Sequence, residues 1–96
     1  MNNNQKIVSY ALEGNLDFVS VPKFAAIIDK ILLSNHGLQL DLAQINIGDI
    51  TGVGWLVDLV SRAKQQHKTV ELLRVPKQLL KLMETVKVKA FLPLKS

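Results

Sequence analysis

Cysteine is absent from the sequence, which excludes a disulfide framework and a thiolate metal site and fits a reducing compartment. The first five residues are polar and lack the apolar segment of a signal peptide, and we expect residues 1–5 to be disordered. No apolar run is long enough to cross a bilayer, because Asp29 and Lys30 interrupt the richest stretch, residues 24–33. We therefore expect a cytoplasmic protein without a membrane span, folded as a single domain over residues 1–96.

The patterns of catalytic and metal-binding sites are also missing. The two histidines, His36 and His67, each follow a predicted helix and have no metal-ligand spacing between them. No Ser/His/acid or Cys/His arrangement stands out. The glycines at 48, 52 and 54 lack the lysine of a phosphate-binding P-loop. We therefore expect no enzymatic activity, no metal ion and no cofactor.

Aromatic residues are few, and acidic residues are scarce in the second half of the chain. Through residue 60 the chain has three basic and six acidic residues, whereas from residue 61 onward it has nine basic and two acidic residues. Recognition of nucleic acid needs stacking aromatics or a known motif, and three Phe, one Tyr and one Trp are scattered along the chain. We expect no nucleic-acid binding. The basic half instead indicates contact with an acidic protein surface or anionic lipid.

Hydrophobic spacing predicts a strand and then a helix in the first third of the chain. Residues 6–12 alternate as a strand does, and the two faces are Ile7, Ser9 and Ala11 against Val8, Tyr10 and Leu12. Residues 13–15 are typical of a turn, and Asp17 is interpreted as a turn or cap residue. A helix is predicted to begin at Ser20, a capping residue, and to close near Gly37, which suits a left-handed C-terminal position.

The rest of the chain repeats this order. Residues 38–43 are predicted to form a strand that is central in the sheet, and residues 69–75 form another. A helix follows each strand, the first ending near residues 65–68 and the second starting at Pro76. Residues 89–94 are predicted to be a short strand or helix. The order β-α-β-α-β-α favours a parallel or mixed sheet with helices packed on it.

The loop before the second helix holds the most informative residues. It reads Gly-Asp-Ile-Thr-Gly from residue 48 to 52 and precedes an apolar helical pattern. Asp49 and Thr51 lie where a cap belongs, and a helix N-terminus favours negative charge. The Thr51 hydroxyl therefore has two interpretations: a helix cap, or a contact or phosphoacceptor on a surface that faces a partner. Trp55 is interpreted as a core or boundary residue.

A strand, then Asp49-x-Thr51-Gly52, then a helix opening Gly-Val-Gly-Trp-Leu-Val resembles the STAS domain. This is the family of anti-sigma-factor antagonists and sulfate-transporter tails, and the resemblance covers residues 7 to 94. In the antagonists the loop reads Asp-Ser-Ser-Gly and the second serine is phosphorylated. Thr51 matches that second serine, while Ile50 departs from the first. The resemblance implies a single α/β domain with a mixed β-sheet and helices packed on it.

The resemblance implies two leading roles, and both work by protein–protein contact. One is that of the MlaB-like branch of the family: a non-catalytic subunit of an ABC-type phospholipid transporter that maintains outer-membrane lipid asymmetry. Such a subunit binds the transporter ATPase and is held at the inner membrane by that partner. The other role is an anti-sigma-factor antagonist switched by phosphorylation of Thr51, with an anti-sigma factor or kinase as its partner. A nucleotide-binding module is a third class.

The transporter role is favoured for three reasons. Ile50 and Thr51 replace the two serines of a phospho-switch, the chain is short, and its basic C-terminal half would suit a complex at an anionic membrane. We expect the partner-binding residues to be Asp49, Ile50, Thr51, Gly52 and Trp55. Lys77 and Lys81 are expected to flank that contact electrostatically.

Overall fold

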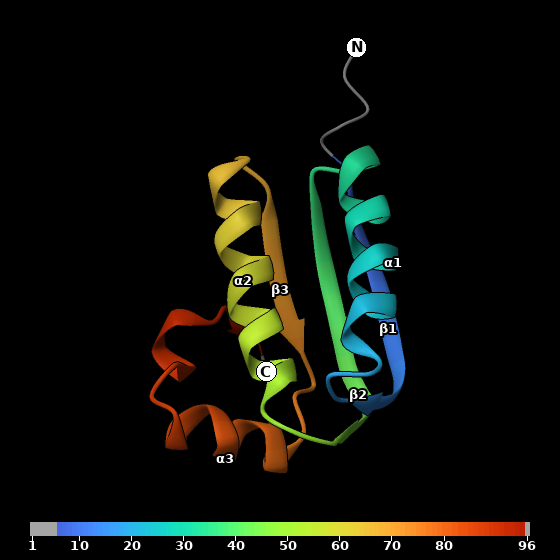
Figure 1. The fold of residues 1–96 in the computed structure, drawn as a ribbon. Coiled ribbons are helices and arrows are strands. Elements are labelled where there is room, and N and C mark those ends of the chain that lie inside the picture. The colour runs from blue at the N-terminus through green and yellow to red at the C-terminus, as the bar shows by residue number, and fades with distance from the viewer. Residues whose placement is uncertain (1–5, 96) are drawn as a thin grey trace.

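The computed structural model describes residues 6–95, with the backbone alone for Lys95. The stretch predicted to be disordered, residues 1–5, lies outside the described residues. Figure 1 shows the elements in chain order: β1 (Ile7–Leu16), α1 (Val21–Ser34), β2 (Gly37–Ile47), α2 (Thr51–Gln65), β3 (Thr69–Leu73), α3 (Lys77–Thr85), the 3₁₀ turn η2 (Lys89–Phe91) and β4 (Leu94–Lys95). The predicted α/β order is confirmed, and the undecided segment near the C-terminus contains both a helical turn and a strand.

The four strands form one sheet in the order β1-β2-β3-β4. All three described pairings are parallel, so the sheet is parallel here rather than mixed. The reason is that a helix-containing crossover joins each strand to the next and returns the chain to the end from which it started. The second strand lies between β1 and β3 and is central, as predicted.

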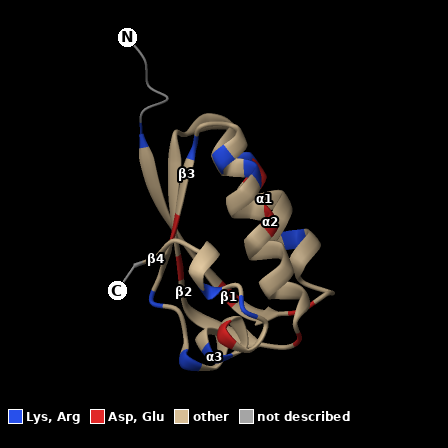
Figure 2. Ribbon diagram, turned by 90° about the vertical axis from the view of Figure 1, so that its left-hand side faces the viewer, with Lys and Arg blue, Asp and Glu red and all other residues tan. Residues whose placement is uncertain are grey.

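The helices lie on one side of the sheet. Helices α1 and α2 cover one face, and α3 lies across the lower end (Figures 1 and 2). Most of the buried strand side chains are leucines, of which Leu38, Leu40 and Leu42 come from β2. The opposite face is polar, and a hydrogen-bonded row crosses it from Ser9 through Gln39 to Glu71. This alternation is what the period of a strand with one buried face requires.

Two predictions about glycines are wrong: the turn at residues 13–15 and the left-handed position of Gly37 at the end of the first helix. Residues 13–15 continue β1, and the pairing register shifts between Ala11 and Glu13. The positive φ of 111° at Gly14 therefore accompanies an irregular strand and not a turn. Gly37 begins β2 and has no positive φ. A Cβ there would lie 2.2 Å from Thr69 Oγ1, so this glycine is explained by close packing between neighbouring strands.

Candidate functional site

Two loops meet at the edge of the sheet where β1 and β2 end. One connects β1 to α1, and the other connects β2 to α2. The backbone N–H of Gly48 donates to the carbonyl of Leu16 at 3.0 Å. The N–H of Phe18 donates to Asp49 Oδ2 at 3.1 Å. Because parallel strands end at the same edge, residues about thirty positions apart are brought together there.

The Asp49 carboxylate organises this junction. Its second oxygen, Oδ1, accepts from the N–H of Thr51 at 2.9 Å, which satisfies a first-turn donor of α2. Partial desolvation raises the pKa of Asp49, but hydrogen bonds from the Phe18 N–H and from the hydroxyl and N–H of Thr51 outweigh that effect. The net pKa is lowered from the ordinary value of 3.8. Asp49 is therefore held as a carboxylate between the two loops.

The interpretation of Thr51 as a side-chain cap is wrong. Thr51 is the first residue of α2, the cap position is Ile50, and no side chain at that position caps the helix. Asp49 provides the acceptor instead. The Thr51 side chain is exposed, so its hydroxyl lies at the surface beside the positive end of the helix dipole.

The β1–α1 loop is ordered by its own side chains. Asp17 Oδ1 accepts from the N–H groups of Val19 and Ser20 at 3.0 and 2.9 Å, which confirms Asp17 as a turn residue. Ser20 occupies the cap position of α1, yet its hydroxyl makes no capping bond. It accepts from the N–H of Asp17 instead. This short turn fixes the direction in which Phe18 and Val19 face.

Two glycines allow the loops to approach closely. A Cβ at Gly48 would lie 2.7 Å from Asp17 Cβ. A Cβ at Gly52 would lie 2.3 Å from Leu16 Cγ, and Leu16 is fully buried. The glycine of the Asp-x-Thr-Gly motif therefore lets the start of α2 rest directly on the end of β1.

Exposed apolar side chains stand on the two loops that adjoin at Asp49. Phe18, Val19 and Ile50 have exposed fractions of 68%, 71% and 54%. The hydrogen bond between Phe18 and Asp49 places these side chains on adjoining loops. We call Phe18, Val19, Ile50 and Thr51 the loop patch. Exposed apolar side chains together with an exposed hydroxyl are suited to packing against a protein surface.

The predicted site residues occupy different depths. Ile50 and Thr51 are exposed and Asp49 is half-buried, whereas Gly52 and Trp55 are buried. Trp55 belongs to the core, where its ring centroid lies 6.3 Å from that of Phe24. Its position agrees with the core alternative, and it supports the loop from beneath. Lys77 and Lys81 lie on α3 and line a hollow with Lys89, outside the loop patch.

Sequence reasoning missed Phe18 and Val19. Their signal was available: two large apolar residues stand between a turn residue, Asp17, and the cap position, Ser20, and fit no strand or helix period. Apolar residues that belong to no buried face are often exposed for contact. Their proximity to Asp49 follows from the parallel register, which the sequence did not fix.

Within residues 6–95 no group of three or more His, Asp and Glu residues could hold a metal ion. The same described stretch contains no helix that is long and apolar enough to cross a membrane.

Comparisons with known proteins agree with this architecture. A family model described as "Mlab, STAS domain" matches residues 5–93. No curated protein matches the chain. Among solved structures, the chain is similar to the anti-sigma factor antagonist SpoIIAA in its unphosphorylated form, with a TM-score of 0.74 and 16% identity. That match covers 100% of this chain and 84% of the other, and at this identity it shows the fold.

Proposed function

Since this chain belongs to the STAS domain family, we propose that it is the small non-catalytic subunit of an ABC-type phospholipid transporter. In this role it binds the transporter ATPase and so supports the maintenance of outer-membrane lipid asymmetry. It stays on the cytoplasmic side of the inner membrane, held there by its partner. STAS domains of this kind act through protein–protein contact.

The observation that carries the proposal is the apolar character of the loop patch. Ile50 stands where the antagonists have a serine, and it is more than half exposed. Together with Phe18 and Val19 it gives the two adjoining loops an exposed apolar character. A permanent contact benefits from such a surface, because its burial stabilises the complex. A contact that phosphorylation must break gains less from an apolar surface.

In the proposed complex the ATPase contacts Ile50 and Thr51 directly, and Phe18 and Val19 extend the contact. Asp49 holds the two loops together. Gly52 and Trp55 lie beneath the surface and position the start of α2. By binding one arrangement of the ATPase better than others, the domain would favour that arrangement.

The test is affinity purification of the tagged protein from its own host, with solubilised membranes and cytosol analysed separately by mass spectrometry. We expect an ABC ATPase and its permease in the membrane fraction. Phe18→Asp and Thr51→Glu should each reduce this recovery at least tenfold, because each adds a charge to an apolar contact. The matched control is Leu33→Asp, an exposed apolar position on α1 with an exposed fraction of 81%. Normal recovery with both loop variants would show that the loop patch is not the interface.

The second candidate is an anti-sigma-factor antagonist regulated at Thr51. It is supported by the similarity to SpoIIAA and by the exposed hydroxyl of Thr51 at the start of α2. The same purification distinguishes the two candidate functions. Recovery of an anti-sigma factor or a small kinase, with phosphate found on Thr51 by mass spectrometry, would support the antagonist role in place of the transporter role.

A further inference from the structure

The C-terminal edge of the molecule carries an exposed aromatic ring that lies outside the loop patch. Phe91 ends the turn η2 and is 74% exposed. The next residue, Leu92, is buried and anchors the turn to the core. The ring of Phe91 is therefore largely exposed on a fixed support, and its own burial contributes little to folding.

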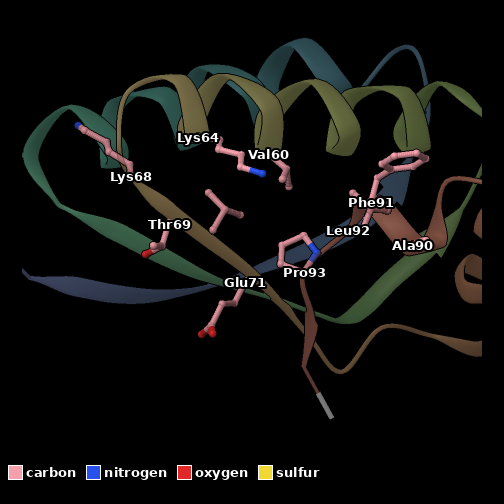
Figure 3. A pocket seen from close by; sticks show the side chains of 10 residues that line it. Val60, Lys64, Lys68, Thr69, Glu71, Ala90, Phe91, Leu92 and Pro93 are labelled. Carbon is pink, nitrogen blue, oxygen red and sulfur yellow. The ribbon is translucent and has the colours of Figure 1, made fainter.

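A hollow of about 430 Å³ lies on one side of η2. Figure 3 shows Val60 and Lys64 of α2 facing it from one side, with Phe91, Leu92 and Pro93 on the other. Lys64 extends over the hollow (Figure 3). Lys68 also lines it, and its ammonium group donates to the carbonyl of Leu32.

A second hollow of about 360 Å³ lies beside the other end of η2. Three lysines line it: Lys77 and Lys81 from α3, and Lys89 from η2. Glu84 is its only acidic lining residue, and it forms an ion pair with Lys89 at 2.8 Å. The turn η2 is therefore a ridge between two hollows, each rimmed by lysine.

Lysines outnumber acidic residues at this edge, where Glu71 lines the first hollow and Glu84 the second. From Val75 to the end, the chain has five lysines and one acidic residue. Lys64, Lys77 and Lys87 form no ion pair in the described part of the chain. Figure 2 faces this edge and shows basic segments on α3. Both arginines, in contrast, pair with aspartates elsewhere.

We propose that this edge, with Phe91 at its tip and Lys64, Lys77, Lys81 and Lys87 around it, docks on an anionic lipid surface. The aromatic ring enters the headgroup region, and the lysines approach lipid phosphates with their alkyl stems against the interface. A phospholipid surface suits a convex ridge with one aromatic tip and several long cationic side chains, because lipids rearrange around it. The inference does not depend on which protein binds the loop patch.

The test is flotation of the purified full chain with vesicles of phosphatidylcholine alone or with about one-fifth phosphatidylglycerol. We expect binding to the anionic vesicles only. Binding should fall steeply with salt, because screening shortens the electrostatic range. The double variant Lys77→Gln/Lys81→Gln should weaken binding about 25-fold, at roughly fivefold per lysine. Phe91→Ser should weaken it about tenfold through the lost apolar contact.

Matched controls lie on α1, far along the chain from this edge. Lys23→Gln/Lys30→Gln removes two exposed lysines, and Leu33→Ser removes an apolar side chain that is 81% exposed. Each should change vesicle binding less than about twofold. All of these positions are exposed, so circular dichroism should show unchanged folding.

Absence of flotation with anionic vesicles, or equal losses in the α1 controls, would overturn the proposal. Retention on polyglutamate without vesicle binding would overturn it as well, and would assign the edge to an acidic protein surface.

Discussion

Two glycines in the same helix are expected to respond to alanine in opposite directions. At Gly52 the added methyl would lie 2.3 Å from Leu16 Cγ and 2.5 Å from Cδ2. Leu16 is only 1% exposed and cannot move outward. Overpacking of this kind costs about 1–3 kcal/mol, while the better helix propensity of alanine returns up to about 1 kcal/mol. We expect Gly52→Ala to lower the free energy of unfolding by about 1–2 kcal/mol.

Gly54 is the matched control. It is exposed, and a Cβ there would meet no atom within 4 Å. Gly54→Ala should therefore raise the free energy of unfolding by about 0.5–1 kcal/mol through helix propensity alone. For a domain of this size, each kilocalorie corresponds to a shift of roughly 4–8 °C in Tm.

The assay is urea unfolding followed both by fluorescence of Trp55, the single tryptophan, and by circular dichroism. The m-value should stay constant, so that midpoint shifts report stability. Adding Leu16→Ala to Gly52→Ala should cost less than the two single changes together, because the new methyl partly fills the cavity. A Gly52→Ala protein as stable as the wild type would refute the reasoning, since it would mean that Leu16 can repack without cost.

Three further predictions concern the loop, the core and the open face. Asp49→Ala should lower the urea midpoint more than Asp49→Asn, because Asn keeps an acceptor for the backbone donors; equal effects would contradict this role. Trp55→Phe should cost less than about 1.5 kcal/mol by circular dichroism, against about 3–5 for Trp55→Ala, since its buried Nε1 has no partner among the described residues. The pKa of Asp41 is held below 3.8, first by the hydrogen bond from the Arg74 side chain. The stability that this pair adds to the fold is complete above pH 3.8 and is lost as the pH falls through the lowered pKa of Asp41. Arg74→Gln should therefore flatten the fall in urea midpoint between about pH 6 and pH 2, and an unchanged slope would contradict the pairing.

Local spacing is sufficient to predict the type and order of the elements. Alternation in residues 6–12 separates Val8, Tyr10 and Leu12 from the other face, and the structure packs this set against the core. Helical spacing predicts one apolar face for Phe24, Ile27, Ile28, Ile31 and Leu32, of which Phe24, Ile28 and Leu32 are buried in α1. These predictions succeeded because a strand period and a helix period are properties of neighbouring residues. The parallel pairing, by contrast, depends on contacts about thirty residues apart.

The errors arose where a residue has several physical uses. Gly14 suits a turn and Gly37 suits a helix C-terminus, yet Gly14 accompanies a register shift and Gly37 avoids a clash with a neighbouring strand. A cap is one of the two interpretations of Thr51 because its residue type suits that role, whereas Asp49 accepts the hydrogen bond from the first-turn N–H. The loop patch was half predicted: Ile50 and Thr51 came from the motif, but Phe18 and Val19 required knowledge of which loops adjoin.

The sequential strand order has a consequence for how the chain folds. Ile7 pairs with Gly37 and Gly37 with Thr69, so β2 and β3 each join the strand made thirty or thirty-two residues earlier. No strand in the described residues must wait for a later one to be inserted between itself and its neighbour. Folding can therefore proceed from the N-terminus in the order of synthesis, with β1, α1 and β2 as the template. The two-residue strand β4 joins last, and the lysine-rich edge around η2 is completed only then.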